Sequence, residues 1–320
     1  MRILFMGTSQ FAVPTLKALL ASQHQVIGVV TQPDRPSGRG RQLRYAPIKQ
    51  VALEAGLPIY QPEKVRSEDF VELVREMSPD VIVVAAFGQI IPKSILDVPN
   101  YGNVNVHASL LPKYRGAAPV HHALFNGETR TGVTTMLMDP GLDTGPVLLQ
   151  RDVNIDPEDD EGILEARLAE IGARLLLETV DSLEEGTIVP TPQDDSQATL
   201  APSVKKEDCE LDWRQSARTL VNRVRGCTPR PGAYASLGGV SLRIWTCRIV
   251  EPPTESCAEG FGPQADAGVP GEVLAVTSEG IVVRAGEGAM LLTEVQPENK
   301  RRMSAADFAR GYRITPAPPA

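Results

Sequence analysis

The chain has 320 residues, of which 42% are hydrophobic and 22% are charged, the composition of a globular protein long enough for two domains. Its formal net charge of −8 argues mildly against a nucleic-acid partner. The sequence has no apolar run of the roughly 20 residues that cross a bilayer, and its first residues lack the apolar core of a signal peptide, which argues against a membrane protein and predicts a cytoplasmic one.

Strand-like and helix-like patterns alternate over the first 190 residues. Apolar runs predict strands at 2–8, 25–31, 80–87, 103–107, 132–138 and 146–155. Amphipathic spacing predicts helices at 11–22, 48–56, 67–77, 117–126 and 160–185. This alternation is typical of parallel strands joined by crossover helices. We therefore expect a doubly wound α/β domain with a mostly parallel sheet over residues 1–188.

The remainder of the chain has a different pattern. Residues 189–206 are proline-rich and weakly periodic, which predicts a linker. After one helix near 214–225, five strand-like runs alternate with glycine turns, at 232–237, 240–250, 271–278, 280–286 and 288–297. They predict a small OB-like β-barrel domain over residues 207–315, with an inserted loop at 251–270.

The four cysteines, Cys209, Cys227, Cys247 and Cys257, all lie in this second part of the chain. None belongs to a C-x-x-C pair, so the spacing predicts neither a metal site nor a disulfide framework. We expect free thiols, as in proteins of a reducing compartment.

Basic residues cluster in spite of the negative net charge. Seven arginines and no acidic residue lie between Trp213 and Arg248. The segment 34–49 holds five basic residues and one aspartate, and residues 300–302 form a third basic cluster. A partner that carries phosphates responds to the local field within a Debye length of about 8–10 Å rather than to the net charge. Together the clusters indicate such a partner, whereas each of them alone is equally compatible with a solvated basic face.

The strand predicted at 103–107, NVNVH, ends in polar residues. Because strand side chains alternate between faces, Val104 and Val106 point to one face while Asn105 and His107 point to the other. Ligands of a doubly wound sheet bind beyond the carboxyl ends of its strands. An amide donor and an imidazole at this place can polarise a carbonyl and move a proton. The alternative is a pair of satisfied polar groups in the core.

A turn-rich loop, MDPGLDTGPV (138–147), supplies a carboxylate. Asp143 lies between Gly141 and Gly145, which allow the backbone to bend so that the side chain reaches into a site. The alternative is an aspartate whose side chain caps its own turn. Since an imidazole needs a partner that sets its tautomer or balances its charge, we expect Asp143 to serve His107.

These segments resemble the signature of the folate-dependent formyltransferases. NVNVHASLLPKYRGAAP (103–119) followed by GLDTG (141–145) is similar to the catalytic region of that family. TQPDRPSGRGRQL (31–43) and NRVRGCTPRPGAY (222–234) are similar to the members that act on charged tRNA. The resemblance covers both predicted domains, from residue 2 to about residue 312.

The resemblance implies that a formyl group passes from 10-formyltetrahydrofolate to the amino group of the methionine carried by initiator tRNA, without a metal. Asn105, His107 and Asp143 would be the catalytic residues. Asn105 would donate a hydrogen bond to the oxyanion, and His107, held or charged by Asp143, would stabilise it further. The amine proton would leave through the His107–Asp143 pair or through a bound water.

The resemblance also implies which residues bind the two substrates. The segment SLLP (109–112) lines the folate site in this family, and the loop AFGQIIP (86–92) and the segment DPGLD (139–143) would form further walls. The implied folate-binding residues are Gln89, Ile91, Ser109, Leu110, Leu111 and Pro112. The implied tRNA-binding residues are Arg39, Arg41 and Arg44 in the first basic segment, and Arg223 and Arg225 in the arginine-rich helix.

Two other functions stay open at this point. A formyltransferase for a sugar nucleotide or a purine precursor, or a formyl-folate hydrolase, would share the three catalytic residues but would not need the basic segments. A tRNA-binding module without activity would not need the catalytic residues. The departures from the family pattern, at Ala108, where glycine is frequent, and at Arg230, where tryptophan is common, concern the tRNA surface rather than the reaction. We expect a monomer that does not bind membranes.

Overall fold

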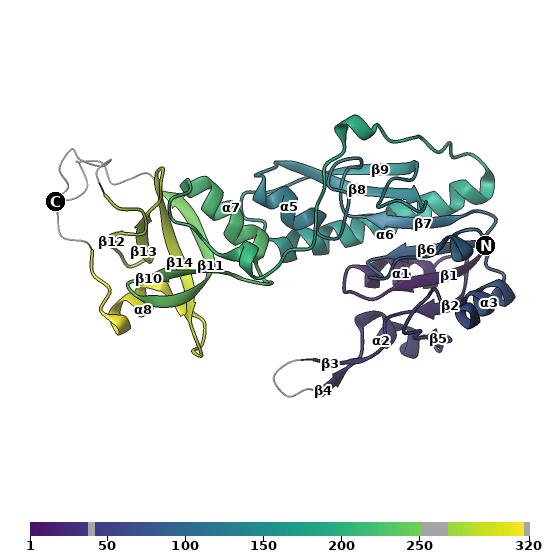
Figure 1. Cartoon of the computed structure of the whole chain (residues 1–320), viewed down its shortest axis with the longest axis horizontal. Coiled ribbons are helices and arrows are strands. Elements are labelled where there is room, and N and C mark those ends of the chain that lie inside the picture. Colours follow the sequence, from purple (N-terminus) through teal and green to yellow (C-terminus); the bar gives the residue numbers. More distant parts are fainter. Residues whose placement is uncertain (38–41, 251–267, 317–320) are drawn as a thin grey trace. The chain divides into compact units, whose positions relative to one another are not determined.

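The computed structural model describes residues 1–37, 42–250 and 268–316, and the chain divides into two compact units (Figure 1). The first unit comprises Met1–Pro119, Arg130–Ile155 and Leu164–Pro202. The second comprises Val120–Thr129, Asp156–Ile163 and the chain from Ser203 onward. Two short segments of the N-terminal half thus group with the second unit. No sequence periodicity indicates this association, because it depends on packing between distant segments.

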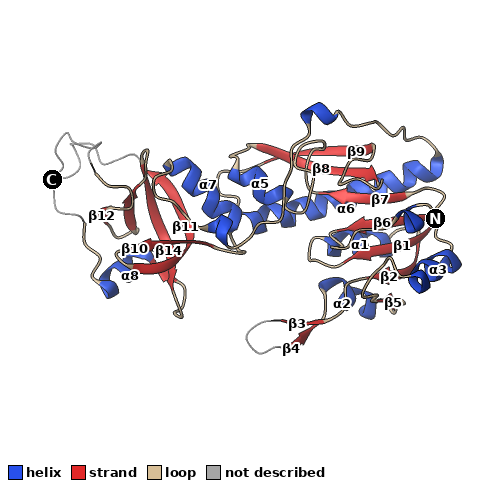
Figure 2. Cartoon of the chain, in the orientation of Figure 1, coloured by secondary structure: helices blue, strands red, loops and turns tan. Residues whose placement is uncertain are grey.

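A seven-stranded sheet of described residues forms the centre of the first unit (Figure 2). Its strands are β1 (Arg2–Gly7), β2 (Gln25–Val30), β5 (Ile59–Tyr60), β6 (Val81–Ala85), β7 (Asn103–His107), β8 (Arg130–Leu137) and β9 (Val147–Asn154). They are ordered β5-β2-β1-β6-β7-β8-β9, with parallel pairing from β5 to β7 and antiparallel pairing of β8 with β7 and β9. The helices are α1 (Ala12–Leu20), α2 (Pro47–Glu54), α3 (Glu68–Met77), α4 (Lys93–Leu96) and most of α6 (Glu161–Glu185). The predicted mostly parallel α/β sheet is confirmed.

Helices cover both faces of this sheet. On one face, side chains of β1 and β6 share a hydrophobic cluster with α3 and α4. On the other face, a Cβ on Gly172 of α6 would lie only 2.9 Å from Val106 Cγ1 of β7, so glycine permits the close approach of this helix. In the parallel register, Asn105 of β7 pairs with Val84 of β6, which belongs to the α3–α4 cluster. Asn105 and His107 therefore lie on the face covered by α3 and α4.

Two short strands, β3 (Arg35–Ser37) and β4 (Gln42–Arg44), pair as an antiparallel hairpin within the first basic segment. The sequence pattern does not predict them, because three residues are too few to display an alternation. The residues between the two strands, 38–41, lie outside the described part of the chain.

Residues 191–201, here called the strap, run along the first unit although their composition predicts a linker. Thr191 exchanges backbone hydrogen bonds with Val147 of β9, both 2.8 Å long. Arg115 donates to the carbonyl of Thr199 at 2.8 Å, and Ala201 donates to the carbonyl of Arg115 at 2.7 Å. The strap also contains a 3-10 turn, η1 (Asp195–Gln197). Its single proline, Pro192, and the prolines that flank it limit regular structure but do not prevent such isolated bridges.

A six-stranded antiparallel sheet of described residues forms the second unit. Its strands are β10 (Ala233–Leu237), β11 (Val240–Val250), β12 (Val273–Val276), β13 (Ile281–Arg284), β14 (Ala289–Pro297) and β15 (Met303–Ser304). They are ordered β10-β11-β14-β13-β12, with β15 beside β14. The helices are most of α5 (Pro119–Phe125), α7 (Ala217–Cys227) and α8 (Ala305–Tyr312), with a 3-10 turn, η2 (Glu207–Cys209). Leu220 and Val224 of α7 and Phe308 of α8 share one core with the sheet. The small β domain, predicted as an OB-like barrel, is confirmed, and its sheet is antiparallel.

Two of the expected free thiols are bonded to each other. Cys209 of η2 and Cys227 of α7 form a disulfide across 18 residues of sequence. The prediction was wrong because it considered spacing alone, whereas packing of η2 against α7 brings the two sulfurs together. Among the described cysteines, Cys247 keeps a free thiol, and burial raises its pKa to about 12.

No helix in the described part of the chain combines the length and the apolar composition needed to cross a bilayer.

Candidate active site

The polar residues of β7, Asn103, Asn105 and His107, differ in their contacts. Asn103, buried at the start of the strand, donates from Nδ2 to the carbonyl of Leu96 at 2.8 Å and so ties α4 to the sheet. Asn105 and His107 follow toward the carboxyl ends of the parallel strands. His107 is 5% exposed, and its Nε2 lies 2.9 Å from the carbonyl oxygen of Tyr114. Because a carbonyl only accepts hydrogen bonds, Nε2 carries a hydrogen, and Nδ1 is left for the site.

Asp143 reaches the same place from the loop between β8 and β9. Its Oδ2 accepts a hydrogen bond from Gly116 N at 2.8 Å and lies 3.7 Å from His107 Nδ1. Its Oδ1 accepts a longer hydrogen bond, of 3.4 Å, from Asn105 Nδ2. The structure therefore brings together the three residues predicted to be catalytic. At 3.7 Å the contact with His107 is an ion-pair distance, so the Tyr114 carbonyl, rather than Asp143, orients the imidazole.

Two positive backbone φ angles accompany this convergence. Asp143 has φ of +52°, in the left-handed region that aspartate tolerates better than most residues. Gly116 has φ of +124°, and a Cβ there would lie 2.7 Å from the carbonyl oxygen of Ala201 in the strap. Only glycine fits this position without displacing the strap. The glycine of the KYRGAAP segment thus allows the backbone to place its N–H group where it donates to Asp143 Oδ2.

The SLLP segment that follows β7 is anchored to the neighbouring strands. Ser109 and Leu111 are buried. The backbone N–H and carbonyl of Leu111 are both hydrogen-bonded to side chains of β8 and β9, at 3.1 and 2.8 Å. Leu110 and Pro112 are only partly buried, so their side chains are the two in this segment that a ligand can contact.

In the loop after β6, the exposed side chain is not one of the two, Gln89 and Ile91, that the resemblance implies as folate contacts. The amide of Gln89 is occupied by backbone: Oε1 accepts from Val65 N at 3.1 Å, and Nε2 donates to the carbonyl of Pro62 at 3.3 Å. Ile91 is 6% exposed and belongs to the α3–α4 cluster. Ile90, between them, is 91% exposed. Sequence reasoning missed Ile90 because side chains in a loop follow no regular alternation.

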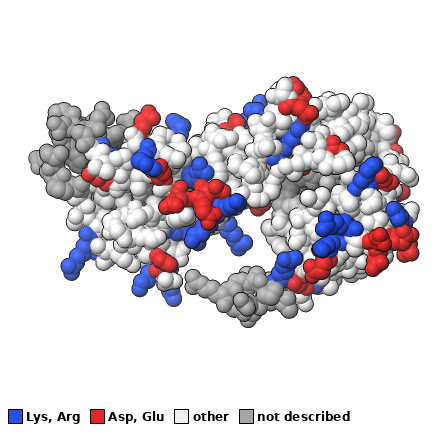
Figure 3. Space-filling model, in the orientation of Figure 1, with Lys and Arg blue, Asp and Glu red and all other residues white. Residues whose placement is uncertain are grey.

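The first group of predicted tRNA contacts is only partly described. Arg39 and Arg41 lie outside the described residues, and of Arg44 only the backbone, opposite Arg35 in the hairpin, is described. On the face drawn in Figure 3, basic side chains of each unit are mixed with acidic ones and do not form one continuous field.

Arg223 and Arg225 of α7 make contacts within the second unit. The guanidinium of Arg223 lies 4.3 Å from the ring centroid of Phe125 and donates to the carbonyl of Asp208. Arg225 donates to two carbonyl oxygens of the segment before α6, at 2.7 and 2.8 Å. Arg218, on the same helix, is exposed. The arginines of this helix thus differ in how available they are to a phosphate.

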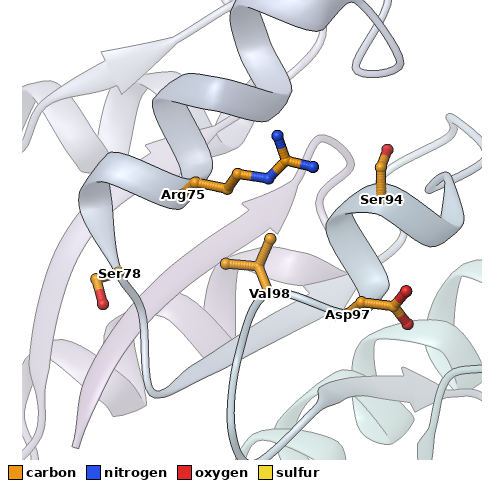
Figure 4. Close-up of a pocket in the computed structure, with 5 residues that line it drawn as sticks. All are labelled: Arg75, Ser78, Ser94, Asp97 and Val98. Carbon is orange, nitrogen blue, oxygen red and sulfur yellow. The ribbon is translucent and has the colours of Figure 1, made fainter.

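A polar pocket of about 370 Å³ lies between α3 and α4. Arg75, Ser78, Ser94, Asp97 and Val98 line it (Figure 4). It shares no residue with the site at the end of β7, and its two charged residues are paired with exposed neighbours four or fewer residues away. Within residues 1–37, 42–250 and 268–316, no cluster of His, Cys, Asp and Glu is arranged to hold a metal ion.

The sequence matches two known domain families, Formyl transferase over residues 1–180 and Formyl transferase, C-terminal domain, over residues 203–313. The methionyl-tRNA formyltransferase of Solibacter usitatus is 51% identical over 315 residues, which cover 98% of this chain and 97% of that protein. The methionyl-tRNA formyltransferase of Citrifermentans bemidjiense is 47% identical over 316 residues, with coverage of 99% and 95%.

Solved structures share the fold at lower identity. WlaRD, a sugar 3N-formyl transferase crystallised in the presence of dTDP and 5-N-formyl-THF, has a TM-score of 0.65 at 17% identity, over 94% of this chain and 99% of that chain. HypX from Aquifex aeolicus, in complex with tetrahydrofolic acid, has a TM-score of 0.61 at 19% identity; this chain spans 47% of its length. The domain matches and the identities of about one half over nearly the full length show that this chain belongs to the formyl transferase family.

Proposed function

We propose that this protein transfers the formyl group of 10-formyltetrahydrofolate to the amino group of methionine esterified to initiator tRNA, in the cytoplasm where that tRNA is used. The observation that carries the reaction is the convergence of Asn105, His107 and Asp143 at the carboxyl ends of the parallel strands. The acceptor is supported by relatives named methionyl-tRNA formyltransferase, which match both units. Sugar formyltransferases share the fold, but at 17% identity.

Asn105 stabilises the charge that develops on the formyl oxygen. The attacking amine must be neutral, and an α-amino group titrates near about 7.7–8. Its attack on the formyl carbon converts the carbonyl oxygen into an oxyanion. An amide nitrogen carries two hydrogens, and only one of those on Asn105 is directed at Asp143, so the other can reach the oxyanion. Loss of one such donor typically lowers the rate by roughly 10²–10³-fold.

His107 moves the proton. Its Nδ1 is the ring atom able to accept the amine proton as the new C–N bond forms, since Nε2 already donates to the Tyr114 carbonyl. The carboxylate of Asp143, 3.7 Å from Nδ1, attracts the positive charge that then develops on the ring. The imidazolium can pass this proton to N10 of the folate as the bond between N10 and the formyl carbon breaks. The reaction needs no covalent intermediate.

We assign the folate to the side of the site lined by the SLLP segment, the loop after β6 and the loop between β8 and β9. Each of them offers an exposed or partly exposed apolar side chain to a flat ring: Leu110 or Pro112, Ile90, and Leu142. The other predicted folate residues, Gln89, Ile91, Ser109 and Leu111, support these segments from within by the hydrogen bonds and burial described above.

We assign phosphate contacts to the first basic segment, through Arg39, Arg41 and Arg44, on the charge of its sequence. In the second unit, exposed arginines such as Arg218 serve this purpose better than Arg223 and Arg225, whose guanidinium groups stabilise their own unit. Phosphate contacts position a tRNA without selecting it. Replacement of Arg39 and Arg41 by alanine should therefore raise KM for the tRNA and leave binding of the formyl donor unchanged.

The experiment that tests this function is an assay of the pure protein with 10-formyltetrahydrofolate and two acceptors, methionyl initiator tRNA and an amino-sugar nucleotide. We expect formylation of the tRNA alone. Formylation of the sugar nucleotide alone would overturn the proposal, and release of formate without an acceptor would identify a hydrolase instead.

A further inference from the structure

The strap holds the loop that carries Asp143. Gln193 makes this contact: its Nε2 donates to the carbonyl oxygen of Asp143 at 2.8 Å and to that of Gly145 at 2.7 Å. One side-chain amide therefore fixes the backbone on both sides of Thr144. Because Asp143 has a positive φ, which few side chains favour, the direction of its carboxylate depends on contacts that hold this stretch of backbone.

Arg115 determines which way the Gln193 amide faces. Its Nε and Nη2 donate to Gln193 Oε1 at 3.1 and 2.8 Å. Arg115 is only 6% exposed, and its Nη2 also lies 2.7 Å from Asp195 Oδ1. A reversed amide would turn its NH₂ group toward the guanidinium and its oxygen toward two carbonyls. The network thus allows one orientation of Gln193.

The same arginine lies in the loop that contacts His107. Its predecessor Tyr114 accepts from His107 Nε2 at 2.9 Å, and its successor Gly116 donates to Asp143 Oδ2 at 2.8 Å. The backbone of Arg115 is in turn bound to the strap by hydrogen bonds of 2.8 and 2.7 Å. The strap is therefore the element that connects the loop holding the imidazole with the loop holding the carboxylate.

We propose that Gln193 is a positioning residue: with Arg115, it sets the place of the Asp143 carboxylate relative to His107 Nδ1. This inference rests on the proposed function in one respect, the choice of methionyl-tRNA as the acceptor in the assay. A glutamate at this position has the right length but turns a carboxylate oxygen toward two carbonyls, and a methionine fills the space without donating. Either change releases the backbone of residues 143–145. A displacement of about 1 Å at a reacting group can lower the rate by roughly 10²-fold.

The first test compares Gln193→Met and Gln193→Glu with a matched control, Gln197→Glu. Gln197 lies in the same strap, is exposed, and donates only across the η1 turn, to Asp194. We expect both Gln193 variants to lose kcat by roughly 10²-fold while KM for donor and acceptor changes little. The control should keep the kcat of the wild type. Unchanged kcat in both Gln193 variants, or a loss confined to KM, would overturn the proposal.

A double-mutant cycle with Asp143→Asn separates positioning from general loss of structure. If Gln193 acts through Asp143, Gln193→Met lowers kcat far less in the Asp143→Asn background than in the wild type. Equal losses in both backgrounds, or failure of both Gln193 variants to fold in thermal unfolding, assign a structural role and reject the proposal. If the wild type does not formylate methionyl-tRNA, the proposed function fails, and the same cycle is run with the amino-sugar nucleotide.

Discussion

The two units use charged side chains in opposite ways. At the site of the first unit, the charged groups are few and largely buried, and the backbone holds them: a carbonyl fixes His107, and an N–H group fixes Asp143. In the second unit, arginines are numerous, and several lie at the surface, as Arg218 does on α7. The first arrangement defines distances between atoms, which group transfer requires. The second leaves single guanidinium groups exposed, and these are the groups that our proposal assigns to phosphates.

Arginine itself shows why the count of a residue type is a poor measure of its role. Arg115 is buried and orients Gln193, and Arg225 bonds to carbonyl oxygens within the second unit. Arg218 has a similar sequence setting to Arg225 but is exposed. Whether an arginine supports the fold or stays exposed depends on the groups packed against it, so its role can be tested by replacing one arginine at a time.

The largest predicted effect is the loss of kcat on replacement of His107. His107→Ala removes the group that accepts the amine proton in the proposed mechanism, so we expect kcat to fall by at least about 10²-fold. Binding of tRNA, measured without the formyl donor, should stay near the wild-type level. The matched control is His122→Ala, in the second unit, which should keep the kcat of the wild type. A His107→Ala enzyme that turns over at nearly the wild-type rate would refute the mechanism.

The next effect concerns the backbone under the carboxylate. Gly116→Ala forces a side chain into φ of +124° and against the carbonyl of Ala201, so we expect a loss of about 1–3 kcal/mol in the free energy of unfolding and a lower kcat. Gly311→Ala, in α8, is the control, because a Cβ there meets no atom within 4 Å. It should stabilise the protein slightly, as alanine favours helix. Equal unfolding curves for the two variants would contradict this reading of the site.

The third prediction separates two arginines of one helix. Arg225→Ala deletes hydrogen bonds to two backbone carbonyls, and we expect it to lower the free energy of unfolding by about 1–3 kcal/mol. Arg218→Ala should leave unfolding unchanged and raise KM for the tRNA, most visibly at low salt. Denaturant unfolding and tRNA titration of both variants measure this contrast. If Arg218→Ala proved the more destabilising, the division between structural and exposed arginines would be wrong.

The smallest effect depends on pH. Burial lowers the pKa of His121 in α5 below its ordinary 6.5, although its ring contacts the Arg230 carbonyl and Glu161. Because the unfolded chain then binds more protons, the second unit should lose stability as the pH falls below about 6.5. His121→Gln should flatten this dependence between pH 7 and 5, because glutamine does not titrate there. Parallel pH profiles of the wild type and the variant would show that His121 does not contribute.

The sequence alone determined what depends on local periodicity. Strand alternation placed Asn105 and His107 on one face, and the alternation of strands and helices placed the end of β7 at a ligand-binding edge, because these patterns repeat within a few residues. The role of Asp143 came from its glycine-flanked loop and from the family resemblance. A signal for α8 was also present, since Ser304 is the N-cap of this helix and accepts a hydrogen bond from the N–H of Asp307, but this helix was not among the predicted elements.

Tertiary structure decided which side chains of irregular segments face the site. Ile90 rather than Ile91 is exposed. The proline-rich composition around the strap did not exclude hydrogen bonds to the loops of Arg115 and Asp143, and Cys209 and Cys227 form a disulfide that their spacing does not predict. These outcomes depend on contacts between segments tens of residues apart. A periodic pattern reports only the face of one element, whereas the position of a loop is set by hydrogen bonds to whatever chain the fold places beside it.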